Sequence, residues 1–368
     1  MAFADIGALR RARVSLFEQG ERVAEPLLVE PDKGESGQVR VIDRDDGDRT
    51  TSEGQAYAMF FALVANDRER FDGLLRWTEL NLASGDLSAH LPAWLWGRGS
   101  DGRWGVLDAN SASDADIWMA YTLLEAGDAW QEPRYTRLGT SLATRIADEE
   151  VVHLPGFGPV LLPGRTGFHH GESYRLNTSY LPLQVFIGLG RLHPGGPWAR
   201  IAERIPALVG ASAPHGFATD WIDFTVGRGF TPSPLGSYDA IRVYLWAGML
   251  DPSTPGRDAM LSALPGMARH LRAKTVPPAK VTRNGVVEDP KGPVGFSAAL
   301  LPYLSALGEK ALEEEQATQV RSQLDASTGL YGSPAKYYDQ NLALFALGSR
   351  ERQFWFDARG RLRTNRSG

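Results

Sequence analysis

The sequence contains no cysteine. This absence excludes disulfides, thiolate metal ligands and cysteine nucleophiles, and it leaves the redox compartment open. A basic excess is missing too, because 39 lysines and arginines stand against 44 aspartates and glutamates, for a net charge of −5. That balance argues against a nucleic-acid-binding protein, whose affinity usually depends on a basic patch.

Long apolar segments are also missing. No apolar run approaches the roughly 18 residues of a membrane span, so we expect no membrane insertion. The first twenty residues place two arginines after a short apolar opening. They lack the apolar stretch of about 7–15 residues that is typical of a secretory signal. A mature sequence behind an initiator methionine would look the same, so the compartment stays open.

Several sites of known chemistry are absent as well. The sequence has no GxSxG elbow, no P-loop and no GxGxxG after a strand. The seven histidines show no paired helical spacing, so we expect no metal and no cofactor. What is abundant is aromatic: 10 tryptophans, 11 tyrosines and 15 phenylalanines accompany the slight acidic balance. This mix is typical of carbohydrate-handling proteins, because aromatic faces stack on sugar rings, but a large aromatic core would give the same count.

Apolar residues recur with the 3.6-residue period of a helix in about twelve stretches, separated by loops rich in glycine, proline, aspartate and asparagine. The expected helices cover residues 3–18, 53–65, 67–83, 114–129, 134–148, 178–191, 196–211, 237–248, 256–273, 295–306, 309–324 and 337–348.

These stretches alternate in character. Residues 114–129 are apolar nearly all round, whereas residues 134–148 carry one apolar stripe and a charged opposite face. Six hairpins of one buried and one surface helix predict an all-α fold, the (α/α)6 barrel, with all of 1–368 as one domain. Valine, leucine and Gly-Pro signals predict a short β hairpin around 149–162, and the polar, turn-rich segment 21–50 predicts an exposed loop.

In such a barrel the inner helices all begin at one rim, so their first turns are candidates for a shared site. Glu53 lies in the first turn of 53–65, on the same face as Tyr57. The spacing from Thr50 to Glu53 also matches a capping box, and a first-turn glutamate suits the helix dipole. Position alone leaves both interpretations open.

Two other inner helices also begin with acids. Asp114 and Asp116 open 114–129 after the candidate cap Ser113, and for Asp116 a role at the helix dipole or as a cap is the simpler interpretation. Asp239 opens 237–248 with Arg242 three residues later. The apolar flanks of this pair favour a buried ion pair over a surface pair.

Aromatic residues precede or adjoin these acidic helix starts. Trp96 and Trp104 lie in the loop before Asp114, and Tyr180 lies near the sixth helix. Acids on one rim with nearby aromatic rings predict a sugar-binding cleft. Two carboxylates are the minimum for hydrolysis of a glycosidic bond, because one protonates the leaving oxygen and the other drives attack at the anomeric carbon.

Three motifs carry a family resemblance. Residues 112–130 read ASDADIWMAYTLLEAGDAW and resemble the signature of glycoside hydrolase family 8, with a departure at Thr122. TSEGQAYAM at 51–59 and SYDAIRVYLW at 237–246 resemble two further landmarks of the family, in the right order. The resemblance runs from about residue 40 to residue 356, and departs where an Asn-Pro-Ser-Tyr motif reads NTSY at 177–180.

Within the family, the chain is most similar to the periplasmic endoglucanases of bacterial cellulose-synthesis operons. Three segments carry this similarity: LPAWLWG at 91–97, GPVGFSAALLP at 292–302 and YYDQNLALFALG at 337–348. The resemblance implies an (α/α)6 barrel that hydrolyses β-1,4-glucan with inversion and without a cofactor. It also implies a periplasmic or secreted protein that associates with a cellulose synthase complex.

The resemblance assigns roles residue by residue. It implies that Glu53 is the general acid, that Asp239 is the general base, and that Asp114 contacts the sugar at the cleavage subsite. It further implies that Tyr238 and Arg242 orient the base, while Trp96 and Tyr180 contact substrate in the cleft. Glu53 must then be protonated near neutral pH, so its pKa should be raised by apolar neighbours or by a nearby acid.

Three alternatives remain. A family member that acts on xylan would share these motifs. A non-catalytic glycan-binding subunit of a cellulose-export assembly could use the same aromatic cleft, although retention of all three acids argues against it. A polysaccharide lyase on a similar barrel would favour a basic cleft, for which the sequence gives no sign.

Overall fold

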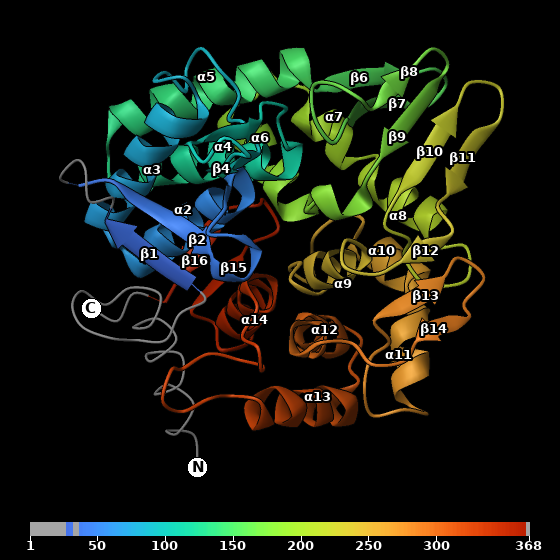
Figure 1. Cartoon of the computed structure of the whole chain (residues 1–368). Coiled ribbons are helices and arrows are strands. Elements are labelled where there is room, and N and C mark those ends of the chain that lie inside the picture. The colour runs from blue at the N-terminus through green and yellow to red at the C-terminus, as the bar shows by residue number, and fades with distance from the viewer. Residues whose placement is uncertain (1–26, 32–36, 366–368) are drawn as a thin grey trace.

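The inner ring of the (α/α)6 barrel consists of six helices that run from one shared rim (Figure 1). The computed structural model describes residues 27–31 and 37–365. The inner helices are α2 (Ser52–Ala65), α4 (Ser113–Ala129), α6 (Leu183–Leu192), α9 (Ala240–Gly248), α12 (Val294–Ala306) and α14 (Tyr337–Arg350). Each packs against the next, and the ring closes where Tyr57 of α2 meets Phe345 of α14 edge to face at 5.0 Å.

The outer helices return the chain to the rim along the outside of this ring. They are α3 (Arg68–Leu82), α5 (Pro133–Glu149), α7 (Trp198–Ala202), α8 (Ile205–Ser212), α10 (Arg257–Ala263), α11 (Pro265–Leu271) and α13 (Lys310–Ser322). Almost every residue of α4 is buried, whereas its outer partner α5 buries only one stripe. This contrast confirms the predicted alternation of buried and half-exposed helices.

Much of the aromatic content fills the centre of the barrel. Trp118 packs against Phe60 and Phe345 with ring centroids 5.0 and 5.2 Å apart, and all three side chains are buried. Trp246 of α9 also meets Trp118, at 5.6 Å. These tilted and edge-to-face contacts are the preferred arrangements of aromatic pairs. Many rings therefore serve the core rather than a sugar site.

Three predicted helices are interrupted by proline. The stretch 178–191 splits into a 3-10 turn, η2 (Thr178–Tyr180), and α6, whose N-cap is Pro182. The stretches 196–211 and 256–273 split where α8 and α11 begin with Pro206 and Pro265 in the first turn. Proline lacks an N–H and suits a helix start, so the chain starts a new helix there. The predicted helix 3–18 lies outside the described residues.

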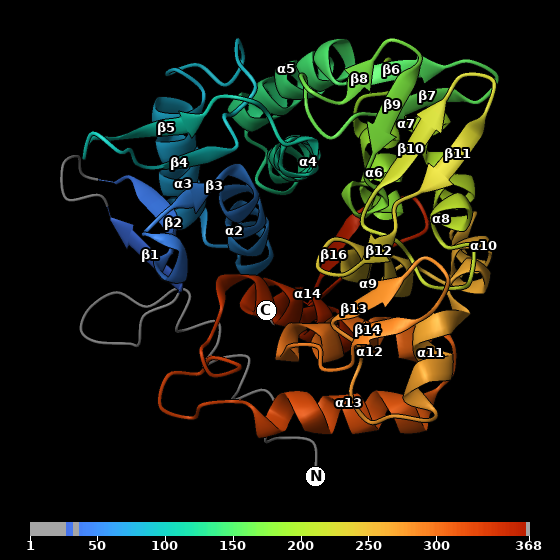
Figure 2. The same cartoon turned by 45° about the vertical axis from the view of Figure 1, so that its right-hand side comes forward.

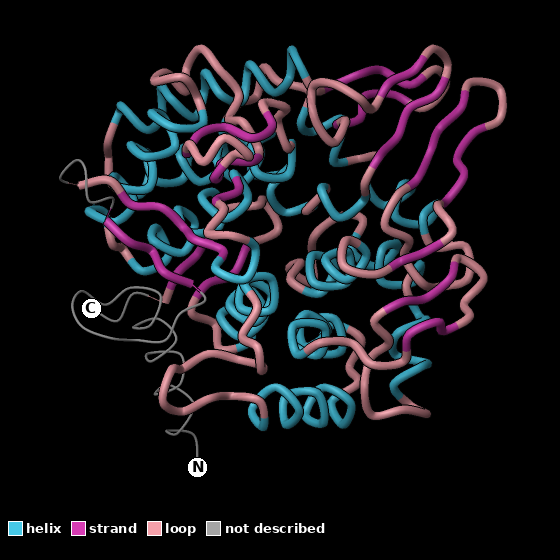
Figure 3. Tube along the Cα trace, in the orientation of Figure 1, coloured by secondary structure: helices cyan, strands magenta, loops and turns pink. Residues whose placement is uncertain are grey.

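Short antiparallel strands decorate the helices (Figure 3). The predicted hairpin at 149–162 is present as β6 (Val151–Leu154) and β7 (Gly158–Leu161). The other strands that decorate the loops are β3 (Thr50–Thr51), β4 (Leu95–Arg98), β5 (Trp104–Asp108), β8 (His169–His170), β9 (Ser173–Leu176), β10 (Ile222–Thr225), β11 (Gly229–Pro232), β12 (Leu235–Gly236), β13 (Lys280–Thr282), β14 (Val287–Asp289), β15 (Phe354–Phe356) and β16 (Leu362–Thr364).

The prediction of an exposed loop over 21–50 is wrong for its described part. There β1 (Leu27–Pro31) pairs with β2 (Val39–Asp43) in an antiparallel hairpin, seen at the left of Figure 2. Val41 and Ile42 are buried, and the backbone N–H of Val41 donates to Oε1 of Gln55 in α2 at 2.7 Å. The alternating apolar residues of β2 face the barrel, and the charged residues around them conceal that pattern in the sequence.

No helix in the described ranges is both long enough and apolar enough to cross a membrane.

Candidate active site

The start of α2 directs Glu53 into the rim of the barrel. The N-cap is Thr51, whose Oγ1 accepts the N–H of Gly54 at 3.1 Å. Thr50 instead belongs to β3 and donates its hydroxyl to the carbonyl of Val41 at 2.6 Å. The capping box suggested by the spacing of Thr50 and Glu53 therefore does not form. The Glu53 carboxyl is left to interact with other inner helices.

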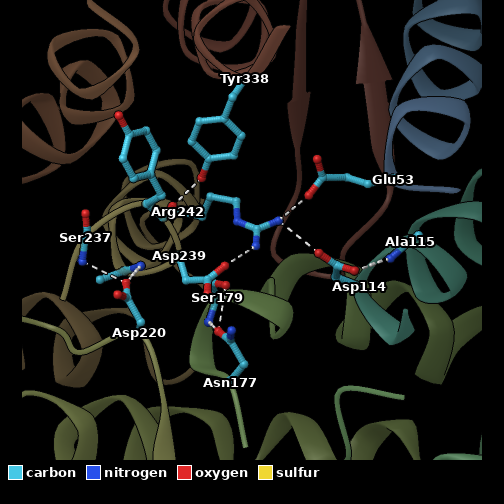
Figure 4. A network of polar contacts seen from close by, with 12 residues as sticks. Glu53, Asp114, Ala115, Asn177, Ser179, Asp220, Ser237, Asp239, Arg242 and Tyr338 are labelled. Carbon is cyan, nitrogen blue, oxygen red and sulfur yellow. Dashed lines mark hydrogen bonds and ion pairs between the residues drawn. The ribbon is translucent and has the colours of Figure 1, made fainter. Parts of the chain in front are cut away.

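Arg242 of α9 joins three carboxylates from three inner-helix starts (Figure 4). Its Nη1 donates to Oε2 of Glu53 at 2.6 Å and to Oδ2 of Asp114 at 2.9 Å, while Nη2 donates to Oδ1 of Asp239 at 2.9 Å. The Arg242 side chain is only 4% exposed. The three acids singled out in the sequence thus form one cluster around a buried cation.

One guanidinium cannot neutralise three carboxylates in a buried site. Burial raises the pKa of Glu53 to about 7, with Arg242 opposing this shift and the charges of Asp114 and Asp239 adding to it. Burial also raises the pKa of Asp114. A carboxyl group whose pKa is raised to about neutrality is typical of a general acid.

Solvent access differs among the three carboxyls. The side chains of Glu53 and Asp239 are 19% and 27% exposed, but that of Asp114 is 4% exposed. Glu53 and Asp239 bind different amino groups of the same planar guanidinium, so Arg242 holds the two carboxyls on either side of itself. In an inverting glycosidase the two carboxyls are roughly 6.5–9.5 Å apart, which leaves room for the attacking water molecule.

Tyrosines surround the cluster, and most of them were not singled out as site residues in the sequence. Tyr337 donates its hydroxyl to Oε1 of Glu53 at 3.4 Å, and the hydroxyl of Tyr57 accepts from Nη1 of Arg242 at 3.3 Å. Tyr338 donates to the backbone carbonyl of Tyr238. Tyr337 and Tyr338 open α14, so the first turn of an inner helix is the sequence signal that marks them.

The two tyrosines to which the family resemblance assigns roles are Tyr180, expected to contact substrate, and Tyr238, expected to orient the base. The guanidinium carbon of Arg242 lies 5.4 Å from the ring centre of Tyr180, within the range of a cation–π contact. Tyr238 is 46% exposed and meets Phe296 edge to face at 5.2 Å. Tyr180 therefore borders the Arg242 cluster, whereas Tyr238, next to Asp239 in the chain, packs on Phe296 and presents the larger exposed surface.

Asp220 is a site residue that the sequence did not reveal. Its Oδ1 accepts the backbone N–H of Ser237 at 2.7 Å and that of Ala240 at 2.9 Å (Figure 4). These bonds fix the backbone on both sides of Asp239. Asp239 is the N-cap residue of α9 (Ala240–Gly248), but its own side chain makes no capping hydrogen bond. Asp220 lies on a loop before β10, with no periodic pattern to relate it to α9.

Trp96 lies in a stack of rings next to the start of α2. It pairs with Thr50 across β3 and β4, meets the buried Trp77 edge to face at 5.2 Å, and stacks on Trp104 at 5.2 Å. The guanidinium of Arg40 lies 4.9 Å from the ring centre of Trp96. Trp96 is thus largely covered, and the 46% exposed Trp104 is the ring with a free surface.

Asp116 does not join the cluster, although it is two residues from Asp114. Both of its oxygens lack an N–H or hydroxyl donor among the described residues, so it does not cap the helix. The N-cap of α4 is Ala112 rather than the expected Ser113. Within the ranges that the structure describes, no group of three or more histidine, aspartate or glutamate side chains is placed so that it could hold a metal ion.

Comparisons with known proteins agree with this geometry. Residues 33–352 match the model of the glycosyl hydrolases family 8. The chain is 49% identical over 328 residues to an endoglucanase of Xanthomonas axonopodis pv. citri (strain 306), covering 88% of this chain and 84% of that protein. It is 44% identical over 332 residues to an endoglucanase of Escherichia coli (strain K12), covering 89% and 87%.

A solved structure extends the similarity to three dimensions. The crystal structure of an endo-1,4-D-glucanase from Vibrio fischeri ES114 superposes with a TM-score of 0.78 at 40% identity, covering 90% of this chain and 95% of that chain. The family model, the relatives and the barrel fold all lead to the same assignment: this chain belongs to the glycosyl hydrolases of family 8.

Proposed function

We propose that this chain is an endo-β-1,4-glucanase that cleaves cellulose-type glucan with inversion at the anomeric carbon. The observation that carries the proposal is the cluster in which Arg242 joins Glu53, Asp114 and Asp239 at one rim of the barrel. The endoglucanases among its relatives support the choice of glucan. We also propose that the chain forms one catalytic domain.

In this mechanism Glu53 protonates the glycosidic oxygen as the bond breaks. Its pKa of about 7 leaves a substantial protonated fraction at neutral pH, and burial among the inner helices is the main cause. The hydroxyl of Tyr337 contacts Oε1, while Oε2 accepts from Arg242. These two contacts hold the carboxyl group in one orientation, which favours proton transfer along a single direction.

Asp239 acts as the general base in the proposed reaction. It is the most exposed of the three carboxyls, so a water molecule can reach it. The hydrogen bond from Nη2 of Arg242 leaves its other oxygen to accept a proton from that water. Attack from this side, opposite the leaving oxygen held by Glu53, inverts the anomeric configuration.

Asp114 is proposed to contact the sugar ring at the cleavage subsite. Its Oδ1 accepts the N–H of Ala115 at 2.8 Å and its Oδ2 accepts from Arg242, so its position is fixed before substrate arrives. With little exposed surface, it would reach only the edge of a ring seated against the cluster. Trp104, Tyr180 and Tyr238 are proposed to contact neighbouring sugars by stacking.

The proposed setting of the enzyme is the bacterial periplasm or the cell exterior, in association with a cellulose synthase complex. The motifs shared with endoglucanases of cellulose-synthesis operons support this setting. Co-purification with the synthase from membranes of the source bacterium, compared with the periplasmic fraction, tests it. Recovery only in the cytoplasm would contradict it.

Product analysis tests the proposed reaction. The chain is incubated with carboxymethyl-cellulose, xylan and chitosan in parallel, and the anomer of the first product is followed by NMR. We expect new reducing ends from carboxymethyl-cellulose, first in the α configuration and without ultraviolet-absorbing unsaturation. A faster reaction on xylan would transfer the proposal to that polymer, and the absence of cleavage would leave a glycan-binding role.

A further inference from the structure

A second group of buried carboxyls lies behind the active-site cluster. Asp116 in α4 and Glu150, which directly follows α5, are both fully buried, and their carboxyl groups lie close enough for each to influence the pKa of the other. Neither residue contacts Arg242, and the proposed mechanism uses neither. A hydrogen bond between two carboxyl groups requires a proton on one of them.

Few hydrogen-bond donors face the carboxyl oxygens of Asp116 and Glu150. Ser111 donates its hydroxyl to Oε1 of Glu150 at 2.6 Å, and the same hydroxyl accepts the N–H of Arg165 at 3.0 Å. Within the described residues, both oxygens of Asp116 and Oε2 of Glu150 have no N–H or hydroxyl donor. A proton on one of the two carboxyls would let that group donate to an oxygen of the other.

The charged groups that face the pair do not stabilise two anions. Asp114 and Glu149 both add negative charge near it. Arg145 is paired with Glu149 at 2.8 Å, and the guanidinium of Arg165 donates to the carbonyl of Ala109. A second buried carboxylate without a cation carries a desolvation cost that protonation avoids.

We propose that Asp116 and Glu150 hold a shared proton at neutral pH and act as positioning residues for Asp114. The pair connects the first turn of α4 to the end of α5 and, through Ser111, to the loop before α4. Ser113 adds a backbone bond from its N–H to the carbonyl of Pro163 at 3.0 Å. The start of α4 is thereby held in the place that points Asp114 at Arg242.

The direction of the pH effect follows from the raised pKa values. Burial raises the pKa of Glu150 to about 8, and it raises that of Asp116 well above its ordinary range. In the unfolded chain both groups would ionise near pH 4. The folded state therefore retains protons that the unfolded state loses, so the contribution of the pair to stability is complete below about pH 4 and declines up to about pH 8.

Thermal unfolding as a function of pH tests the shared proton. Melting temperatures of the unmodified protein, Asp116→Asn and Glu150→Gln are compared between about pH 5.5 and pH 9, with Asp148→Asn as the matched control on the exposed face of α5. We expect the melting temperature of each amide variant, relative to the unmodified protein, to rise by at least about 3 °C across this range. Asp148→Asn should track the unmodified protein. Parallel curves for all four proteins would overturn the proposal.

A direct titration keeps the test decisive if the amide variants do not fold. Carboxyl carbon-13 NMR is recorded on Glu53→Gln, which removes the active-site group that titrates near pH 7. We expect a buried glutamate signal that titrates near pH 8. If no glutamate carboxyl in this protein titrates above pH 7, the pair does not hold its proton as proposed.

The positioning role has its own readout, which rests on the role proposed for Asp114. At about pH 6 we expect Asp116→Ala to lower kcat about tenfold with a smaller change in KM, and Asp116→Asn to recover activity to within about threefold. Equal kcat values for the two variants would overturn the positioning role. The unfolding curves do not depend on the catalytic role proposed for Asp114, so they separate this outcome from a failure of the proposed function.

Discussion

Two groups of carboxyls meet at the start of α4, and they differ in what surrounds them. Asp114 shares Arg242 with Glu53 and Asp239, and this cluster reaches solvent through its two more exposed acids. Asp116 and Glu150 are buried from solvent, and neither forms an ion pair with a cation among the described residues. Burial and nearby negative charge raise the pKa of carboxyls in both groups, whereas a reactive acid also needs a partner that orients it and a route to substrate.

The largest effect is expected when either reactive acid of the Arg242 cluster is removed. Glu53→Gln and Asp239→Asn should each lower kcat on carboxymethyl-cellulose by about 10²–10⁴-fold, because proton transfer is lost while shape is kept. Reducing-end assays measure this. The matched controls are Glu69→Gln and Asp258→Asn, in the first turns of outer helices, which should retain full activity. Near-normal activity of either active-site variant would remove that residue from the mechanism.

The second-largest effect is expected when Arg242, the cation that only the active-site cluster contains, is replaced. Arg242→Lys should lower kcat about 10–100-fold, because one ammonium group cannot donate in a fork to three carboxylates. Steady-state kinetics and a melting curve separate this loss from unfolding. The control is Arg321→Lys, whose arginine pairs with Glu314 on the surface of α13. Unchanged kcat in Arg242→Lys would show that the fork does not organise the acids.

The dependence of kcat/KM on pH tests whether Glu53 in the Arg242 cluster loses its proton near neutral pH. Since the pKa of Glu53 is raised to about 7 and the reaction requires its protonated form, kcat/KM should fall about tenfold per pH unit above that value. Initial rates at low substrate concentration across pH 5–9 measure this. A profile that stays flat to pH 9 would contradict Glu53 as the general acid.

The smallest effect is expected at the aromatic edge of the cleft. Trp104→Ala should raise KM for long cello-oligosaccharides about three- to tenfold with little change in kcat, because it removes a stacking surface away from the reacting bond. Leu107→Ala, on the same strand β5 and 37% exposed, is the control. An unchanged KM across oligosaccharide lengths would show that no sugar rests on Trp104.

Much of the fold could be predicted from local pattern. The apolar period located the helices and their alternation, and the first turns of inner helices brought out Glu53, Asp114 and Asp239. The interruptions of two helical stretches could also be predicted, because Pro206 and Pro265 have no N–H to donate inside a helix and are tolerated only in its first turn. These features depend on residues that are close together in the chain.

Other features depend on contacts across the chain. Asp220 caps a helix that begins after an intervening hairpin, and no local signal connects the two. The sequence placed Asp116 at a helix start, where a capping role was the simpler interpretation. Its partner Glu150 belongs to the end of another helix, so only the folded chain distinguishes a cap from a buried pair.

The short ladder between β3 and β4 couples two parts of the cleft mechanically. Thr50 pairs with Trp96, and the helix that carries Glu53 begins two residues after Thr50. A slip of one residue between these strands would turn the indole of Trp96 to the opposite face of the sheet, while Glu53 would stay in place. The position of Trp96, and of the Trp104 ring stacked on it, relative to Glu53 is therefore set by strand register, which an insertion in the loop between α3 and β4 could alter without changing Glu53 itself.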